Sequence, residues 1–317
     1  MDIGIKSENT VFLFPGQGSQ AVGMGRELAQ ANPIAREVFE QANDLLGFNL
    51  AKIAWEGPEE ELNDTINTQP ALLVHSVAAL QVFKEKYPDF RPAYVAGHSM
   101  GEISSLVAAQ ALPFGAALLL ARRRGELMKQ AGEQSPGGMA AILGLDIPTL
   151  EQVCVESSRP DEIVQVANDN SPGQVVISGA SPALDRAVEL ARQAGARRAV
   201  RLAVSIAAHS PLMAHSQMEF NRAVEAAPIR NPQIPIIGNI SASPLLTAED
   251  IRSDLEAQLT SRVRWTETVR LFVNSGITTF LEMGSGSVLT GLLKRIDRQA
   301  HGIPLATPAD FTRLEAI

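Results

Sequence analysis

The chain has 317 residues, of which 45% are hydrophobic and 20% are charged, and its formal net charge is −8. This balance is ordinary for a globular protein, and the negative charge excludes a general attraction to nucleic acid. The single cysteine, Cys154, excludes an internal disulfide and is expected in the core, and no apolar run approaches the roughly 20 residues that span a bilayer. We therefore expect a cytoplasmic monomer with no nucleic-acid or membrane partner.

Short apolar runs that alternate with helical patterns predict an α/β fold with a largely parallel sheet. The first run, residues 11–14, precedes a glycine-rich loop. A second run, residues 93–96, precedes the sequence GHSMGE and a helical pattern over residues 103–111. Two further strands are expected at residues 234–237 and 278–283.

The middle of the chain has a different order of elements: strand, helix, two strands, helix, strand. This order is that of the ferredoxin-like fold. We therefore predict a small ferredoxin-like domain at residues 135–204, inserted into a larger α/β domain formed by residues 1–134 and 205–317. The expected strands are 139–143, 162–167, 174–178 and 199–204, and the expected helices are 148–156 and a segment that starts at Pro182 behind the N-cap Ser181 and stops at Gly195.

Residues 97–101 have the sequence GHSMG, a G-x-S-x-G motif between an apolar strand and an amphipathic helix. In such a strand–turn–helix the glycines allow a tight turn that exposes the serine hydroxyl at the helix N-terminus. Ser99 is therefore a candidate nucleophile, and the N–H of Met100 is a candidate donor to an oxyanion. The alternative is a glycine-rich turn in which Ser99 only caps the helix.

A serine nucleophile needs a base, and the chain has five histidines. His98 adjoins the serine, and neighbouring side chains on a tight turn diverge. His75 lies in an apolar helical run and is expected in the core or in a cleft wall, and His301 lies in a polar tail. His209 lies in a predicted loop between a strand and a helix, where catalytic residues gather in α/β folds. His209 is therefore favoured as the base, with His215 as its rival.

The segment 117–130, ALLLARRRGELMKQ, is typical of a helix with successive arginines. Residues of a helix are about 100° apart, so successive arginines cannot share one face. Arg122 and Arg123 each have Glu126 as a helical neighbour, which indicates a solvated face. Arg124 has apolar neighbours and is expected to point inward. A buried guanidinium is costly unless it meets a carboxylate, either from an internal acid or from a bound substrate.

Several stretches of sequence give the chain its resemblance to a known family. It resembles the bacterial malonyl-CoA:acyl carrier protein transacylases along nearly its whole length. This resemblance implies an α/β-hydrolase-like domain with an inserted ferredoxin-like domain, and transfer of malonyl from coenzyme A to an acyl carrier protein in fatty acid biosynthesis, without a cofactor or a metal. The matching stretches are FPGQGSQ at 14–20, QPALL at 69–73, GHSMGE at 97–102, RGELM at 124–128, NSPGQVVISG at 170–179, VSIAAHSPLM at 204–213, QLTSRVRW at 258–265 and EMGSGSVLTGLLKRI at 282–296.

Position by position, the resemblance implies roles for individual residues. Ser99 is the nucleophile and His209 its base, and the histidine is oriented by a main-chain carbonyl near Gln258 rather than by an acid. Arg124 binds the carboxylate of the substrate. The oxyanion donors would be Gln17 and Met100, and the residues with supporting roles would be Asn170 and Asn239.

Three positions depart from the family pattern. Ala208 stands before the histidine where relatives often have Phe or Ser, and a smaller wall there admits a bulkier acyl group. Arg262 and Ser285 each replace a common proline, and neither touches the expected chemistry. These departures leave strict selectivity for malonyl open.

Three other enzyme classes share part of this pattern. Residues 16–21, GQGSQA, fit a dinucleotide-binding fingerprint, but the acids that follow, Glu37 and Glu40, lie in a helical pattern where the fingerprint needs a strand end. A serine thioesterase or esterase would share the serine and the histidine, although it has no need of a buried Arg124. A trans-acting polyketide-synthase acyltransferase would carry another acyl unit.

An acidic carrier protein would need a local basic surface on a chain that is itself net acidic. Two clusters qualify, Arg197 and Arg198 with Arg201, and Lys294 with Arg295. The alternative is that both clusters are solvated ends of helices and strands.

Overall fold

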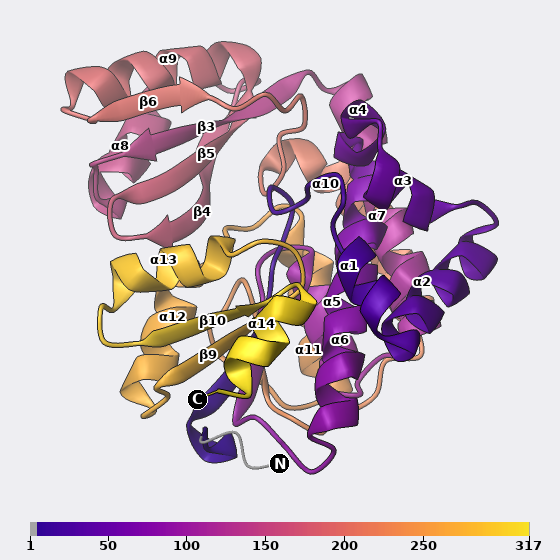
Figure 1. The fold of residues 1–317 in the computed structure, drawn as a ribbon. Coiled ribbons are helices and arrows are strands. Elements are labelled where there is room, and N and C mark those ends of the chain that lie inside the picture. Colours follow the sequence, from indigo (N-terminus) through magenta and orange to yellow (C-terminus); the bar gives the residue numbers. More distant parts are fainter. Residues whose placement is uncertain (1–4, 317) are drawn as a thin grey trace.

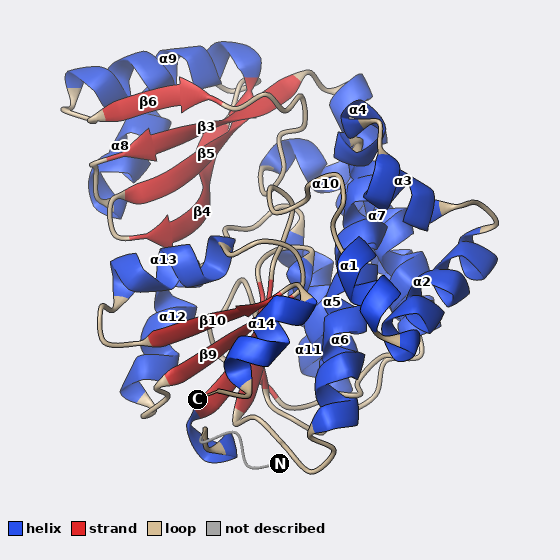
Figure 2. Ribbon diagram, viewed as in Figure 1, coloured by secondary structure: helices blue, strands red, loops and turns tan. Residues whose placement is uncertain are grey.

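The computed structural model describes residues 5–316 and contains two sheets of different kinds (Figures 1 and 2). The larger sheet has six strands in the order β10-β9-β1-β2-β7-β8. All neighbours are parallel except β8, which pairs antiparallel with β7. The strands are β1 (Thr10–Phe14), β2 (Tyr94–Gly97), β7 (Ile236–Ile237), β8 (Pro244–Leu245), β9 (Thr279–Met283) and β10 (His301–Leu305).

Helices cover the larger sheet, and the longest of them is buried within this layer (Figure 1). The flanking elements are η1 (Ser7–Asn9), α1 (Arg26–Ala31), α2 (Pro33–Leu46), α3 (Leu50–Glu56), α4 (Glu59–Asn63), α5 (Thr65–Lys86), α6 (Gly101–Ala108), α7 (Phe114–Gln134), η2 (Pro211–Met213), α10 (Ala214–Ala226), α11 (Ala248–Gln258), α12 (Trp265–Asn274), α13 (Val288–Ile296) and α14 (Pro308–Leu314). Helix α5 is fully buried over residues 69–80, which are mainly apolar.

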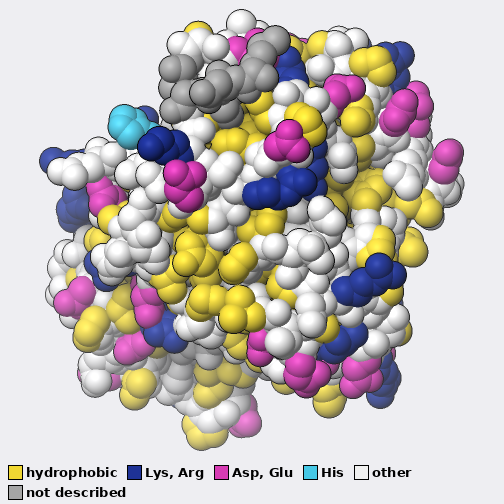
Figure 3. Space-filling model, turned by 90° about the horizontal axis from the view of Figure 1, so that it is seen from below, with side chains coloured by type: hydrophobic (Ala, Val, Ile, Leu, Met, Phe, Trp, Pro, Cys, Tyr) yellow, Lys and Arg dark blue, Asp and Glu magenta, His cyan; other side chains and the backbone are white. Residues whose placement is uncertain are grey.

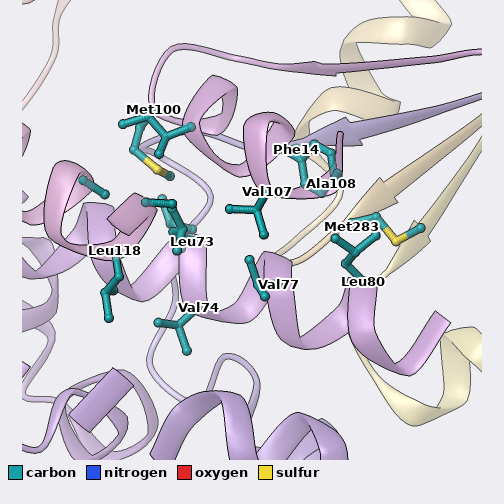
Figure 4. Packing of buried hydrophobic residues seen from close by; sticks show 14 of the residues in the cluster. Phe14, Leu73, Val74, Val77, Leu80, Met100, Val107, Ala108, Leu118 and Met283 are labelled. Atoms are coloured by element: carbon teal, nitrogen blue, oxygen red, sulfur yellow. The ribbon is translucent and has the colours of Figure 1, made fainter. Parts of the chain in front are cut away.

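The core of the larger unit lies between α5 and the sheet. Figure 4 shows Leu73, Val77 and Leu80 along α5, with Val107 of α6 and Met283 of β9 close by. These side chains are almost wholly buried. Because apolar area removed from water stabilises the fold by about 25 cal/mol per Å², this layer fixes α5 against the strand ends from which the loops emerge.

The smaller sheet has four antiparallel strands in the order β4-β5-β3-β6 (Figure 2). Its order along the chain is the ferredoxin-like order that the sequence predicts, and it has a hydrophobic cluster of its own that includes the buried Cys154. The α/β fold class is therefore confirmed. The elements are β3 (Gly137–Leu143), α8 (Ile147–Ser157), β4 (Val164–Ser171), β5 (Gln174–Ala180), α9 (Ser181–Gln193) and β6 (Arg198–Arg201).

Some expected elements differ in extent from those found. The strand expected at 199–204 ends at Arg201, and the helix expected over 103–111 spans Gly101–Ala108. His301, expected in a polar tail, lies in strand β10, which the sequence did not predict. This strand contains Pro304 and forms one edge of the sheet, where a missing N–H is tolerated. The domain boundaries at 135 and 204 stay a prediction.

Residues 1–4 and 317, which belong to the predicted larger domain, lie outside the described part of the chain. Across residues 5–316, no helix combines the length and the apolar character needed to cross a bilayer.

Candidate active site

Ser99 lies in a strained turn between β2 and α6. Its φ angle is +52°, a left-handed conformation that a residue with a side chain adopts only where the surroundings impose it. A Cβ on Gly97 would lie 1.9 Å from the carbonyl carbon of Gly101, and one on Gly101 would lie 2.1 Å from the carbonyl oxygen of Phe14. Both glycines are thus required by close approach, as in a nucleophile elbow. The half-buried Ser99 hydroxyl is left at the N-terminus of α6.

His209 contacts the Ser99 hydroxyl from a loop that precedes η2. The distance from Nε2 to Ser99 Oγ is 2.8 Å. On the other side of the ring, Nδ1 lies 2.9 Å from the carbonyl oxygen of Gln258 and 3.1 Å from that of Ser261. Carbonyl oxygens only accept hydrogen bonds, so Nδ1 carries the proton and Nε2 is left to accept the serine proton.

The electrostatics of the site keep this imidazole neutral. Burial, reinforced by the positive charge of Arg124, lowers the pKa of His209 to about 3. The two carbonyl contacts of Nδ1 oppose this shift only in part. A neutral imidazole is the form that can accept a proton, so His209 is in the basic form at neutral pH.

The other four histidines do not reach the serine. His215 is exposed on α10. His98 bonds through Nε2 to Asn170 Oδ1 at 2.8 Å, and His75 is a buried histidine of α5 whose Nε2 lies 2.9 Å from a carbonyl oxygen. His301 lies on β10. The contact with Ser99 therefore belongs to His209 and not to its sequence rival His215.

Arg124 is buried, with 1% of its surface exposed, and points at the same serine. Its Nη2 donates to Ser99 Oγ at 3.1 Å and to Gln258 Oε1 at 2.9 Å, and its Nη1 donates to Gln69 Oε1 at 2.9 Å. A further contact is to the sulfur of Met128. None of these acceptors is a carboxylate. Burial lowers the pKa of Arg124 to about 10, so the guanidinium stays charged at neutral pH.

The other two arginines of α7 lie where the helical spacing places them. Arg122 Nε is 2.9 Å from a Glu126 carboxylate oxygen, and Arg123 Nη1 is 3.7 Å from the other. Both pairs are partly exposed. In the described part of the chain, the hydrogen bonds of the Arg124 guanidinium are all to neutral groups, so no internal acid is paired with it.

Two backbone N–H groups lie free beside the elbow. Within residues 5–316, neither the N–H of Gln17 nor that of Met100 donates a hydrogen bond. Gly16 brings the first loop against the elbow, because a Cβ there would lie 2.4 Å from the His98 carbonyl oxygen. Figure 4 shows Met100 packed above Leu73 of α5. Donors of an oxyanion site must not be occupied by a protein acceptor, and these two N–H groups meet that requirement.

Further side chains hold the site together. Asn239 Oδ1 accepts from the N–H of Ser99 at 2.7 Å, as suits its predicted supporting role. Gln165 of β4 donates to the His209 carbonyl oxygen at 2.8 Å, which ties the small sheet to the histidine loop. Sequence reasoning missed Gln165 and the arginine partner Gln69. The signal for Gln165 is faint: it is a single polar residue, half-buried between the buried Val164 and Val166.

The three departures from the family pattern lie at different distances from this chemistry. Ala208 is buried beside His209. Arg262 pairs with Glu151 at 2.8 Å, and Ser285 donates to the carbonyl oxygen of Ser19 at 2.7 Å.

The two predicted basic clusters are brought together. Arg197, Arg198 and Arg295 line one cavity of about 580 Å³, together with Leu143, Pro172 and Gly173. Lys294 is exposed on α13. Arg201 is separate in its contacts, because it pairs with Asp185 at 2.7 Å. The cavity borders the turn between β4 and β5, three residues along the chain from Asn170, whose side chain contacts His98.

A strained serine at a strand–helix turn, a neutral histidine and free N–H groups define a site for acyl transfer through a serine. The family model for the acyl transferase domain matches residues 11–310 of this chain. A malonyl CoA-acyl carrier protein transacylase from Haemophilus influenzae is 44% identical over 303 residues, which cover 96% of this chain and 97% of that protein.

Solved structures agree with this comparison. An acyl carrier protein S-malonyltransferase from Vibrio cholerae has a TM-score of 0.94 and 40% identity, and the match covers 97% of this chain and 100% of that one. A malonyl-transacylase solved with its type II PKS acyl-carrier protein also has a TM-score of 0.94, with 41% identity over 98% of this chain and 100% of that one. The chain belongs to the family of malonyl CoA-acyl carrier protein transacylases, which confirms the resemblance seen in its sequence.

The low pKa of His209 predicts the pH dependence of serine acylation. With a histidine of ordinary pKa near 6.5, the acylation rate would fall about thirtyfold from pH 8 to pH 5 as the base becomes protonated. Because the pKa of His209 is lowered to about 3, we expect the rate to change less than about threefold over this range. The measurement is the burst rate with p-nitrophenyl acetate, a neutral acyl donor.

Arg124→Ala removes a positive charge that lowers the pKa of His209. The acid limb of the acylation rate against pH should therefore lie at higher pH in this variant than in the wild type. Arg123→Ala is the matched control and should keep the wild-type profile, because that side chain is exposed and paired with Glu126. An inflection near pH 6.5 in the wild type would contradict the buried, neutral base.

Proposed function

We propose that the chain transfers malonyl from malonyl-CoA to the phosphopantetheine thiol of an acyl carrier protein, through a malonyl ester of Ser99. The observation that carries the proposal is the position of Ser99 Oγ between His209 Nε2, at 2.8 Å, and Arg124 Nη2, at 3.1 Å. A base and a buried cation thus meet at one hydroxyl. We place the reaction in fatty acid biosynthesis, in the cytoplasm, with the enzyme as a monomer that needs no bound cofactor or metal.

In the first half-reaction, Ser99 Oγ attacks the thioester carbonyl of malonyl-CoA while its proton passes to His209 Nε2. The N–H groups of Gln17 and Met100 donate to the oxyanion of the tetrahedral intermediate. The carbon–sulfur bond then breaks, and His209 returns its proton to the coenzyme A thiolate. The carbonyl oxygens of Gln258 and Ser261 hold Nδ1–H throughout, so the imidazolium is oriented without a carboxylate.

In the second half-reaction, the phosphopantetheine thiol of the carrier protein replaces coenzyme A. His209 takes the thiol proton, the sulfur attacks the Ser99 ester, and the serine leaves with the proton that His209 returns. Both half-reactions use the same groups in reverse order, which makes the kinetics ping-pong.

The buried guanidinium of Arg124 supports malonyl as the acyl group. Its planar fork matches a carboxylate in a two-point contact, and the free carboxylate of malonate is the charge that it lacks. Gln69, Gln258 and the serine hydroxyl supply only neutral acceptors in its place. A thioesterase for neutral acyl groups would gain nothing from this arrangement, so we favour transfer of a carboxylated acyl group.

The covalent intermediate tests the proposed nucleophile and base. Malonyl-CoA should add one malonyl mass to the wild type and none to Ser99→Ala, as measured by intact-mass spectrometry. His209→Ala should acylate at least about a hundredfold more slowly, since a general base contributes that much. His215→Ala is the matched control, because that histidine is exposed, and it should acylate normally. Loss of acylation in His215→Ala alone would refute the assignment of the base.

The role of Arg124 predicts a change in acyl selectivity. Arg124→Ala should weaken malonyl transfer by about 2–4 kcal/mol in transition-state binding, the loss expected for a buried charge pair. Acetyl transfer should be unchanged or faster, because acetyl has no carboxylate. The measurement is kcat/KM for both acyl-CoA donors, with Arg123→Ala as the control. An equal loss for the two acyl groups would mean that Arg124 has a structural role only.

We also propose that the carrier protein docks on the cavity lined by Arg197, Arg198 and Arg295, with Lys294 beside it on α13. Three arginines from two separate segments converge there. On the face in Figure 3 the charges are mixed, with Lys and Arg side chains interspersed with Asp and Glu. A local positive site is what an acidic partner needs on a chain of net charge −8.

Charge reversal tests this docking site. Arg198→Glu should raise KM for the carrier protein, with a stronger effect at low salt, and should leave the rate of Ser99 malonylation by malonyl-CoA unchanged. Arg36→Glu, an exposed change on α2, is the matched control for net charge. Equal damage to both half-reactions would indicate a disturbed active site instead of a lost docking contact.

A further inference from the structure

Two carboxyl side chains lie buried behind the Ser99 elbow, and the chemistry proposed above uses neither of them. Glu102 of α6 has no exposed surface, and Asp254 of α11 is 3% exposed. Ionised carboxylates are rarely buried together, because each loses hydration and each repels the other. The pair therefore requires a physical account.

The hydrogen bonds of the two carboxyls are divided unevenly. Glu102 Oε2 accepts from the backbone N–H of Asn239 at 3.1 Å, from its side-chain Nδ2, and from Gln258 Nε2 at 3.1 Å. Asp254 Oδ2 also accepts from the backbone of Asn239, at 3.3 Å. The remaining oxygens, Glu102 Oε1 and Asp254 Oδ1, are buried and find no donor among residues 5–316.

One proton accounts for both orphaned oxygens. Both carboxyls accept from the backbone N–H of Asn239 and their side chains are in hydrogen-bond contact with each other, so a proton held by Glu102 would be donated to Asp254. Burial and the neighbouring carboxyl raise the pKa of Glu102 well above its ordinary value, and burial raises the pKa of Asp254 to about 6. Glu102 is thus the group that holds the proton, and Asp254 is the ionised partner.

We infer that Glu102 and Asp254 share one proton and act as a positioning pair that fixes the amide orientations of Asn239 and Gln258. Neither carboxyl touches the reacting atoms. The inference deepens the proposed function and rests on it.

The amide orientations matter because each amide presents its oxygen to the active site. Glu102 Oε2 accepts from Gln258 Nε2, so Gln258 Oε1 faces Arg124 Nη2. A reversed Gln258 would place an NH₂ group against the guanidinium. Glu102 likewise holds Asn239 Nδ2, so Asn239 Oδ1 faces the N–H of Ser99. This acceptor oxygen is shared by both amides. It acts together with the carbonyl oxygens of Gly97, which accepts from Asn239 Nδ2 at 2.8 Å, and of Ser99, which accepts from Gln258 Nε2 at 3.3 Å.

Substitution by glutamine distinguishes a protonated Glu102 from an ionised one. Glutamine has the shape of the protonated acid: its NH₂ would donate to Asp254 Oδ1 and its oxygen would accept from Asn239 and Gln258. Glu102→Gln should therefore keep kcat for malonyl transfer within about threefold of the wild type. Glu102→Leu, which has no acceptor, should lower kcat at least about a hundredfold with a smaller change in KM for malonyl-CoA. Glu102→Gln as inactive as Glu102→Leu would overturn the inference.

A second measurement does not depend on activity. Above about pH 6, where Asp254 is ionised, the folded pair holds about one proton that the unfolded chain does not, so the contribution of this pair to stability falls as pH rises. Arg124 and His209, the ionisable groups nearest the pair through Gln258, keep their charge states in the folded protein because their pKa values are about 10 and 3. The lowered histidine pKa values add a slope of their own, which is common to the wild type and the variant and cancels when the two are compared.

Glu102→Gln removes the shared proton, so the slope of unfolding free energy against pH should change by about one proton relative to the wild type. Urea unfolding at several pH values measures this slope. Glu282→Gln is the matched control for the substitution itself. Both oxygens of this buried carboxyl accept backbone N–H groups, so an amide NH₂ there would face a donor and should lower the free energy of unfolding. An unchanged slope in Glu102→Gln would refute the shared proton. Absence of malonylation in the wild type would instead refute the proposed function and leave the slope interpretable.

Discussion

The site is organised around a guanidinium that is buried at 1% exposure and bonded only to neutral acceptors. A buried charge without a counter-charge is unfavourable, and a protein keeps one where a ligand completes it. Two other features of the site are linked to this charge, the pKa of His209 and the hydrogen bond to the serine hydroxyl. Burial, reinforced by this cation, lowers the pKa of His209 and keeps the imidazole neutral, and the cation also donates to the serine hydroxyl. One charge thereby helps to lower the pKa of His209 and, in the proposed function, binds the substrate carboxylate.

The nucleophile depends on a second constraint, which is close backbone packing at the elbow. The positive φ of Ser99 is maintained because Gly97 and Gly101 let β2, α6 and the end of β1 approach within distances that a side chain would forbid. His209 also has a positive φ, of +58°. Strained residues of this kind persist where their surroundings over-determine them. Here Asn239 Oδ1 accepts from the N–H of Ser99, the carbonyl oxygen of Gln258 accepts from His209 Nδ1, and Gln165 donates to the His209 carbonyl oxygen.

The small sheet contributes to the site as well as to the architecture. Gln165 of β4 holds the carbonyl oxygens of His209 and Thr260, and Asn170 at the end of the same strand binds His98. Side chains of the small sheet therefore hold loops of the larger sheet by hydrogen bonds. The end of this sheet at the β4–β5 turn carries Arg197 and Arg198, which meet Arg295 of α13 in one cavity. This arrangement links the proposed docking surface to the residues beside the nucleophile.

The sequence by itself determined the local features: the elbow motif, the inward face of Arg124, the ferredoxin-like order of the middle segment and, through resemblance, the family. Motif spacing and helical periodicity record these because each depends on residues close together in the chain. Reasoning from the residues favoured His209 over His215, and the resemblance implied it, but only the tertiary structure shows the contact of His209 with Ser99, because the two residues are 110 positions apart and folding brings them together. It also placed His301 in an edge strand and joined Glu102 to Asp254. Such contacts lie between distant segments, and no local pattern encodes which buried polar groups will face each other.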